Sequence, residues 1–376
     1  MQRLVVVGAG VIGLSCAWQA AVAGWTVTLV DPHPARGASW VAGGMLAPVT
    51  EAWPGEEELL DLGVQSLRRW PRFAADLTAA AGRSPGLRTE GTVVAATGAG
   101  DRAELGSLAT FLGRLGRDVE QLSGRELRRL EPALGPDVRG GLSVPGDLAV
   151  DNRALLAALL GAGARAGVRL VERAVAAITE DGERVTGVRL GAPGAPPDLA
   201  ADAVLVCAGA HSGLLHPDLH GVVRPVKGEI IRLAHRAGAL PPPSRTVRAL
   251  VDGRPLYAVP RDGGGLVIGA TQYEAGFDAD VTVGGVRDLL RDAERVLPAV
   301  AEYALVETAA GLRPGSPDNR PLIGALGPSG LLVATGHGRN GMLLAPVTAD
   351  AVLALLRHEP GPPAADPHRF AALTGR

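Results

Sequence analysis

Three glycines spaced as Gly8, Gly10 and Gly13 constrain the fold of this chain more than any other feature. They stand between a short apolar run at residues 4–7, which predicts a buried strand, and an alanine-rich run at residues 11–23, which predicts a helix. A second apolar run at residues 26–30 predicts another strand. About thirty residues suffice for two parallel strands and the helix that connects them. The sequence therefore predicts a β-α-β unit at its start.

Each glycine has its own physical role in such a unit. Gly8 permits the tight turn, Gly10 has no Cβ and so lets a pyrophosphate approach the backbone, and Gly13 lets the helix pack close to the sheet. The helix start at Val11 and Ile12 offers unpaired N–H groups and a partial positive charge to phosphates. The motif therefore predicts a bound dinucleotide, and a tight turn without a nucleotide is the alternative.

An acid closes the second strand. Asp31, which precedes Pro32, follows Gly13 by eighteen residues, where a carboxylate accepts hydrogen bonds from ribose hydroxyls. A carboxylate at this position disfavours a 2′-phosphate. FAD or NAD is therefore expected rather than NADP, and the motif alone does not choose between the first two.

The run from Leu4 to Val30 contains no charged residue and follows Arg3, as in a signal peptide or a membrane span. The glycine pattern, the β-branched ends, the alanine-rich middle and Asp31 explain it as part of the nucleotide-binding unit instead. We therefore expect a cytoplasmic protein without a membrane anchor.

Length and charge exclude several classes of protein. A chain of 376 residues is long enough for two domains. The formal net charge is −2, so there is no basic field to attract nucleic acid or an anionic membrane. Cys16 and Cys207 belong to no CxxC pair and lie in apolar runs, so we expect buried, reduced thiols.

Periodicity predicts the remaining elements. A capping box of Ser123 and Glu126 predicts a short helix at residues 123–130. Further helices are expected at residues 56–81, 152–166, 286–297 and from about 338 to 358. Strands are expected at residues 92–96, 168–172, 174–179, 185–190, 204–207, 229–233, 256–260, 266–271 and 331–335. Residues 192–197 and 240–244 are expected to form surface loops, whereas residues 39–48 are a small, glycine-rich segment.

The order of these elements predicts the domain organisation. Parallel-sheet strands lie near the start, middle and end of the chain, with antiparallel material between them. We expect a mixed α/β (α+β) fold: a Rossmann-like dinucleotide-binding domain of residues 1–47, 148–222 and 308–376, and an inserted antiparallel-sheet substrate domain of residues 48–147 and 223–307.

Several further motifs resemble the D-amino-acid oxidase superfamily of FAD-dependent oxidoreductases, and most closely the glycine oxidases of thiamine biosynthesis. The resemblance runs through nearly the whole chain. Its motifs are Ala38-Ser39 with Gly43-Gly44-Met45-Leu46-Ala47-Pro48, Pro225-Val226-Lys227-Gly228-Glu229, Leu256-Tyr257-Ala258-Val259-Pro260, Gly311-Leu312-Arg313-Pro314, Asp318-Asn319-Arg320-Pro321-Leu322-Ile323-Gly324 and Gly336-His337-Gly338-Arg339-Asn340-Gly341.

The resemblance implies FAD as the cofactor and indicates which residues hold it. Small residues at 38–45 would let backbone N–H groups reach the isoalloxazine ring, a flexible loop being the alternative. The helix that starts near Gly341 would direct its N-terminus at the flavin N1/C2=O edge, where a plain helix start is the alternative. The implied cofactor-binding residues are Gly8, Gly10, Val11, Ile12, Gly13, Asp31, Pro32, Ala38, Ser39, Gly43, Gly44, Met45, Val175, Ala208, Gly209, His337, Gly338, Arg339, Asn340, Gly341 and Met342.

By the same resemblance, Arg313 binds the carboxylate of a small amino acid, to which a guanidinium offers two parallel charge-assisted bonds. Tyr257 would assist it, Arg339 would approach substrate or flavin from the far side, and Met45 would form the apolar floor. A surface ion pair for Arg313 and a sheet aromatic for Tyr257 are the alternatives. The chain departs from some relatives at Pro255, where they carry a polar residue.

The resemblance implies oxidative deamination of glycine, sarcosine or D-alanine by hydride transfer to flavin N5, with O₂ as oxidant, H₂O₂ as product and the imine supplied to the thiazole of thiamine. It also suggests non-covalent FAD, since no flavin-linking cysteine lies near Arg313, a homotetramer, and a hand-off to a thiazole synthase. No metal is expected, because the histidines at 211, 216 and 220 lie in a loop. The alternatives are another D-amino-acid or sarcosine oxidase or quinone-linked dehydrogenase, a redox-silent FAD-binding protein, and an NAD dehydrogenase.

Overall fold

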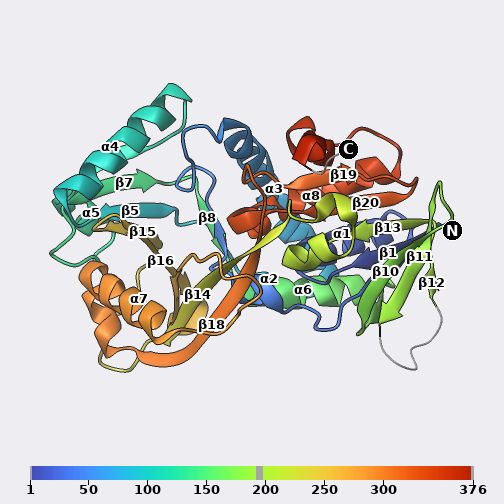
Figure 1. Ribbon diagram of the computed structural model, residues 1–376. Helices are drawn as coiled ribbons and strands as arrows, with labels where there is room; N and C mark the ends of the chain where they lie inside the picture. The colour runs from blue at the N-terminus through green and yellow to red at the C-terminus, as the bar shows by residue number, and fades with distance from the viewer. Residues whose placement is uncertain (1, 192–197, 374–376) are drawn as a thin grey trace.

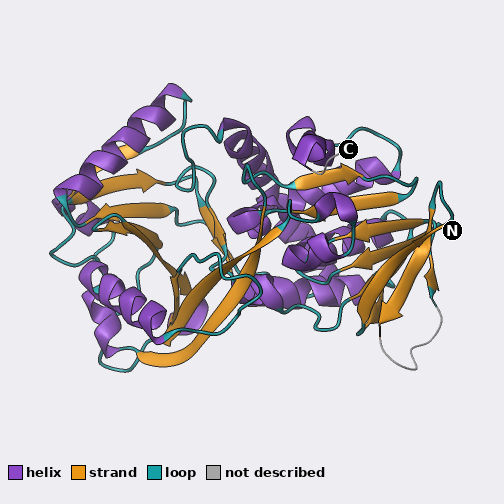
Figure 2. Cartoon of the chain, in the orientation of Figure 1, coloured by secondary structure: helices purple, strands orange, loops and turns teal. Residues whose placement is uncertain are grey.

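The structure is a computed structural model that describes residues 2–191 and 198–373, so the loop expected at residues 192–197 lies outside the described residues. Figure 1 shows two lobes: one contains β1, β13, β20 and helices α1, α3 and α8, and the other contains β5, β7, β15 and β16 with α4, α5 and α7. The long strands β14 and β18 extend from the second lobe toward the first. Both lobes contain helices and strands (Figure 2).

The first lobe is built on a six-stranded sheet. Its order is β19-β20-β13-β1-β2-β9, with all neighbours parallel except the β19–β20 pair. Strands from the start, middle and end of the sequence therefore lie side by side, as expected. The strands are β1 (Arg3–Val7), β2 (Thr26–Val30), β9 (Arg169–Val171), β13 (Ala203–Val206), β19 (Leu322–Ala325) and β20 (Leu331–Thr335).

Both faces of this sheet are covered, which explains why its central strands are wholly apolar. Leu4 and Val6 of β1 belong to the core beneath the helices, whereas Val5 and Val7 pack toward a three-stranded sheet on the other face. The helices are α1 (Val11–Val22), α3 (Glu57–Ala81), α6 (Asn152–Arg165) and α8 (Gly341–Leu356). The small sheet consists of β10 (Ala174–Glu180), β11 (Val185–Gly191) and β12 (Leu199–Ala200).

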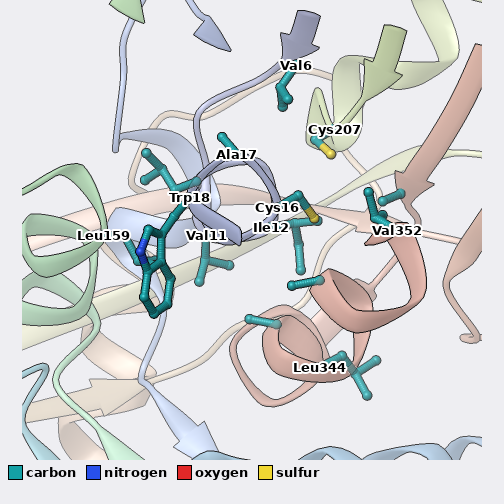
Figure 3. Packing of buried hydrophobic residues seen from close by; sticks show 14 of the residues in the cluster. Val6, Val11, Ile12, Cys16, Ala17, Trp18, Leu159, Cys207, Leu344 and Val352 are labelled. Carbon is teal, nitrogen blue, oxygen red and sulfur yellow. The ribbon is translucent and has the colours of Figure 1, made fainter. Parts of the chain in front are cut away.

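The two cysteines lie in this core. Cys16 of α1 and Cys207 just after β13 are buried and unpaired, among apolar side chains (Figure 3). Burial raises the pKa of the Cys207 thiol well above its ordinary value, and the neighbouring Cys16 raises it further. The prediction of buried thiols is thus confirmed.

The second lobe is built on an eight-stranded sheet of order β18-β14-β17-β16-β15-β5-β7-β6, antiparallel apart from the β15–β5 pair. Helices α5 (Gly124–Leu130) and α7 (Val283–Val296) cover one face, and α4 (Ala99–Arg114) covers part of the other. Its strands are β5 (Thr92–Ala96), β6 (Glu120–Ser123), β7 (Gly140–Val144), β14 (Arg224–Ala234), β15 (Thr246–Val251), β16 (Arg254–Arg261), β17 (Gly265–Gly269) and β18 (Ala304–Gly315).

Short elements connect the lobes and flank the cavity described below. A second three-stranded sheet has the order β3-β8-β4, and α2 precedes β3. These elements are α2 (Gly37–Val41), β3 (Met45–Leu46), β4 (Leu87–Arg88) and β8 (Leu148–Val150). The 3-10 turns are η1 (Gly209–Leu214), η2 (Pro217–Leu219), η3 (Asp262–Gly264), η4 (Pro298–Glu302), η5 (Gly338–Asn340), η6 (Pro363–Ala365) and η7 (Pro367–Leu373).

Most expected elements are present, and the differences have physical reasons. Ser123 caps α5 as expected: Glu126 N–H donates to its hydroxyl at 3.3 Å, and the Glu126 carboxylate accepts from Ser123 N–H at 2.8 Å. Helix α4 was not expected, because Gly100, Gly106 and Gly113 interrupt its apolar pattern. The glycine-rich segment at residues 39–48, for which a flexible loop was the alternative, includes the end of α2 and the whole of β3. The domain boundary expected at residue 308 falls within β18, and the proposed division remains a prediction.

Among the described residues, one helical segment, Gly338–Leu356, is long and apolar enough to cross a bilayer. About two thirds of it (67%) is buried inside the fold, and α8 packs against α1 and α3. Such burial is typical of a core helix.

Trp70 links α3 to α8, and substitution of Trp70 tests the packing of this core. It is fully buried, its indole N–H donates to the Leu343 carbonyl at 2.9 Å, and its ring meets Phe73 edge-on at 5.3 Å. We expect Trp70→Ala to lower the free energy of unfolding in urea by about 3–5 kcal/mol, as for other large-to-small core substitutions. Trp53→Phe, at a half-exposed position, is the control with little change. A loss below about 1 kcal/mol for Trp70→Ala would contradict this packing.

Candidate functional site

A cavity of about 1070 Å³ lies where the two lobes meet. On one side it is lined by residues that directly follow β1, β13 and β20, at the carboxyl ends of the parallel strands. On the other side it is lined by residues of β14, β16 and β18 of the large sheet. The carboxyl edge of a parallel sheet is where open α/β folds bind ligands.

The glycine turn forms one wall of the cavity. Gly8 has a φ of +105°, and a Cβ there would overlap the Cys207 carbonyl. Gly10 lines the cavity, and a Cβ there would meet only the Ser39 hydroxyl oxygen, at 3.1 Å. Gly13 does not line the cavity, and a Cβ there would overlap the Gly8 carbonyl, which fits the expected close packing of α1; its place among the cofactor-binding residues stays a prediction.

This wall fits a negatively charged dinucleotide. Val11 and Ile12 line the cavity at a helix start where Gly10 provides no side-chain cap. Val11 N–H donates to the Ser39 hydroxyl at 3.0 Å. Asp31 lines the cavity, and its carboxylate accepts from the backbone N–H of Ala9 at 2.6 Å, which ties the acid to the glycine turn.

A second uncapped helix start faces the same cavity. Residues 337–342 line it, and no side chain caps α8 at Asn340. The His337 ring is fully buried, with Nε2 3.0 Å from the Thr348 hydroxyl oxygen, and burial lowers its pKa to about 3. The imidazole is therefore neutral at physiological pH, so positive potential at this end arises from backbone N–H groups.

The segment of residues 38–45, which lines the cavity, is held by two residues that the sequence analysis did not identify. Asn152, the first residue of α6, donates to the carbonyls of Ser39 at 2.9 Å and Trp40 at 2.8 Å. Arg261 of β16 donates to the Gly43 carbonyl at 2.6 Å. The sequence could not identify these two residues as supports of the loop, because their partners are backbone carbonyls more than 100 residues away along the chain. The expected residues Ala38, Ser39, Gly43, Gly44 and Met45 line the cavity.

Arg313 of β18 lies on the opposite wall and is half-buried. Its Nη1 donates to the backbone carbonyls of Thr271 at 3.3 Å and Lys227 at 3.5 Å. A Cβ on Gly228 would overlap the guanidinium, so the guanidinium keeps this position only with glycine at 228. Within the part of the chain that the structure describes, no carboxylate pairs with Arg313, which differs from the surface ion pair considered as its alternative.

Tyr257 of β16 lines the cavity between two glycines. A Cβ on Gly43 would lie 2.6 Å from its ring, and one on Gly269 would overlap its hydroxyl. Burial raises the pKa of Tyr257, and the opposing effect of Arg313 does not reverse that direction. The phenol is therefore protonated at neutral pH and available as a hydrogen-bond donor. Pro255 also lines the cavity, on the same strand.

Arg339 lines the cavity but is engaged by two carboxylates. Its Nε lies 2.8 Å from Glu51 Oε2, and its Nη2 lies 3.0 Å from Glu56 Oε2. Glu51 Oε1 also pairs with Nη2 of Arg248, at 2.9 Å. Glu51 and Arg248 line the cavity and were missed by sequence reasoning, because neither belongs to a motif.

The segment of residues 270–282 between β17 and α7, which we call the strap, forms part of the rim of the cavity. Gln272, Phe277 and Ala279 line the cavity, and Lys227 Nζ bonds Asp278 Oδ2 at 2.6 Å. Lys227 is the only lysine of the chain and is buried, so its compact ammonium fixes the strap from within. The remaining expected residues, Pro32, Val175, Ala208, Gly209, Gly338, Gly341 and Met342, also line the cavity.

Comparison with known proteins places these features in a family. The model of the family described as FAD dependent oxidoreductase matches residues 3–355. A glycine oxidase of Pseudomonas aeruginosa is 35% identical over 353 residues, which cover 92% of each chain. The crystal structure of glycine oxidase from Geobacillus kaustophilus has a TM-score of 0.85, with 33% identity and 96% of each chain covered.

Some relatives are longer. The bifunctional protein ThiO/ThiG of Synechocystis sp. is 32% identical over 99% of this chain, but only 54% of that relative is covered. The chain therefore spans about half the length of the bifunctional relatives it matches.

The space beside Gly228 generates one prediction. Gly228→Ala would displace the Arg313 guanidinium, because its new Cβ would overlap it. We expect acetate to bind roughly tenfold more weakly or worse, since a charge-assisted bond contributes about 1.5–3 kcal/mol. Acetate titration followed by the visible absorbance of the flavin measures this. Gly284→Ala, where a Cβ meets open space, is the control. Unchanged acetate affinity in Gly228→Ala would contradict the seating of Arg313.

Asp147 generates a pH-dependent prediction. Burial raises its pKa to about 7, against the lowering effect of hydrogen bonds from Thr50 and Val49 and of the charge of Arg248. An unfolded Asp titrates near pH 4, so between about pH 4 and 7 the folded protein binds a proton that the unfolded chain has lost. This group's contribution to stability therefore falls by about 1.4 kcal/mol per pH unit across that range and is constant above it.

The measurement compares wild type with Asp147→Asn. The unfolding free energy is determined in urea at several pH values for both proteins. The value for wild type minus that for Asp147→Asn should fall by up to about 4 kcal/mol between pH 4 and pH 7. Parallel profiles would show that the Asp147 carboxyl does not retain its proton in the fold.

Proposed function

This chain belongs to the family of FAD dependent oxidoreductases, and from that premise we propose that it oxidises glycine or a similar small amine, such as sarcosine or D-alanine, to an imine. Hydrolysis of the imine from glycine gives glyoxylate and ammonia, and reoxidation by O₂ gives H₂O₂. Glycine is placed first because a relative covered over 92% of its length and a structural neighbour covered over 96% are both glycine oxidases.

The observation that carries this proposal is the guanidinium of Arg313. It lines the cavity and, among the described residues, has no carboxylate partner, while two backbone carbonyls fix its position. A half-buried cation without an anion favours an anionic ligand. The protonated hydroxyl of Tyr257 lines the same cavity and can donate a second hydrogen bond to that ligand.

The opposite wall fits FAD. The residues that would hold it are those at the glycine turn with Asp31, the segment 38–45, Val175, Ala208-Gly209 and the turn 337–342. When bound, FAD supplies the acceptor for the hydride that leaves the substrate Cα. We infer a non-covalent cofactor, because Cys16 does not line the cavity, and Cys207, which does, is buried just after β13 rather than on the strand of Arg313.

The contribution of the chain itself is orientation. Arg313 and Tyr257 hold the carboxylate end of the substrate, so that its amine and Cα are directed toward the wall formed by the glycine turn and α2. Met45 and the α8 start flank that space. Neutral His337 adds no charge there, which leaves the backbone N–H groups at the α8 start to stabilise negative charge.

The metabolic role follows from the bifunctional relatives. The ThiO/ThiG protein joins a relative of this chain to a further segment, and we infer that this chain supplies an imine to the thiazole of thiamine by hand-off to a thiazole synthase. We also propose a homotetramer and O₂ as electron acceptor. The alternatives are another D-amino-acid or sarcosine oxidase or dehydrogenase of this fold, and a redox-silent FAD-binding protein.

Anaerobic reduction tests the proposal. Glycine should bleach the visible flavin absorbance of the purified protein, which a redox-silent protein would not show, and a panel of glycine, sarcosine and D-alanine ranks the substrates. Arg313→Met should retain its flavin but lower kcat/KM roughly a hundredfold or more, because two charge-assisted bonds are lost.

Arg287→Met, at an exposed position on α7, is the matched control. A colourless protein that takes up no added FAD would refute the cofactor assignment, and normal kcat/KM in Arg313→Met would refute the substrate-binding role.

A further inference from the structure

A second group of charged side chains lines the cavity besides Arg313. It consists of Arg248, Arg339 and Glu51, which we call the Glu51 bridge. Arg248 is the direct cross-strand neighbour of Tyr257 in the β15–β16 pair, so both side chains project from the same face of the sheet. Arg339 belongs to η5 of the other lobe. The bridge therefore spans the cavity beside the place proposed for the substrate carboxylate.

Glu51 occupies its place in the way that a ligand carboxylate would. Oε1 lies 2.9 Å from Nη2 of Arg248, and Oε2 lies 2.8 Å from Nε of Arg339. Each carboxylate oxygen thus has its own guanidinium, an arrangement used to recognise carboxylates and phosphates.

The bridge leaves Arg248 incompletely satisfied. Its Nε and Nη1 are buried and, among the described residues, have no hydrogen-bond acceptor. Unpaired buried donors of a charged group cost free energy, so Glu51 alone is a poor complement for this guanidinium. A second acceptor group at this point would accept the hydrogen bonds that Arg248 Nε and Nη1 do not donate to Glu51.

Glu51 is also positioned to move. It lies in residues 48–56, between β3 and α3 and outside any helix or strand. The loop is tethered through its backbone and through Thr50: Glu51 N–H donates to the Ala47 carbonyl at 3.1 Å, Arg339 Nη2 donates to the Glu51 carbonyl at 3.0 Å, and the Thr50 hydroxyl donates to Asp147 at 2.7 Å. The Glu51 side chain can therefore rotate without breaking any of these bonds. If a ligand carboxylate replaces that of Glu51, the number of negative charges between the two guanidinium groups is unchanged.

We propose that Arg248 and Arg339 form a second anionic subsite, which Glu51 fills until a substrate with a second acid group displaces it. The proposal rests on the proposed function, in that Arg313 and Tyr257 hold the first carboxylate. The ligand class is an amino acid or secondary amine with two acid groups, such as D-aspartate or N-carboxymethylglycine. Glycine has no second acid group and leaves the bridge closed.

Matched acid and amide substrates test the subsite. D-aspartate is compared with D-asparagine, and N-carboxymethylglycine with its monoamide, as ratios of kcat/KM. We expect wild type to prefer at least one acid over its amide about tenfold or more. Arg248→Met should reduce that ratio to near one, whereas Glu51→Gln should increase it, because a neutral amide competes less well for the guanidinium groups.

A binding measurement separates this proposal from the proposed function. Succinate and its monoamide succinamate contain no amine to oxidise, so calorimetric titration of the FAD-loaded protein reports binding alone. Tighter binding of succinate, abolished in Arg248→Met and retained in the exposed control Arg72→Met, would establish the subsite even if glycine were not oxidised. Equal binding of both by wild type, or a succinate preference that survives in Arg248→Met, would overturn it.

Discussion

The contact between backbone atoms at Gly8, Gly13 and Cys207 is the constraint on which the rest of the structure depends. At this point α1, β1 and the end of β13 approach so closely that a single Cβ on Gly8 or Gly13 would overlap a neighbouring carbonyl. Because the helix is held against the sheet, its uncapped start opens at the carboxyl edge of the parallel strands. A negatively charged dinucleotide is the ligand that such an edge favours.

The same steric principle recurs on the wall proposed for the substrate. Gly228 leaves room for the Arg313 guanidinium, and Gly43 and Gly269 leave room for the ring of Tyr257. These glycines lie in three separate parts of the sequence, and the space that each leaves accommodates the two side chains proposed to bind the substrate. Preorganisation of this kind lowers the cost of binding, because little rearrangement is needed when a ligand arrives.

The arginines in and behind the cavity wall differ in their hydrogen-bond and ion-pair partners. Arg261 is buried against backbone and Asn152, with Asp151 nearby, and its role is to hold the loop at Gly43. Arg313 has only backbone partners, whereas Arg248 and Arg339 share Glu51. The partners of each guanidinium therefore separate Arg261, which positions the loop, from the arginines proposed to bind ligands.

Local pattern determined much of this protein. The β-α-β unit follows from apolar periodicity and three glycines, the α5 cap from Ser123 and Glu126, and the segments lining the cavity from motif resemblance. Each of these features depends on residues close together in the sequence, or on a motif that has the same meaning wherever it occurs.

Only the tertiary structure decided which distant residues meet. The order of the eight-stranded sheet brings Arg248 beside Tyr257, and the meeting of the lobes brings Arg339 to Glu51, more than 280 residues apart along the chain. It also directs Asn152 and Arg261 to backbone carbonyls that carry no sequence signal. The physical reason is that hydrogen bonds and ion pairs act over a few ångströms in space, whereas sequence periodicity reports only the face that a residue presents and not the partner that it finds there.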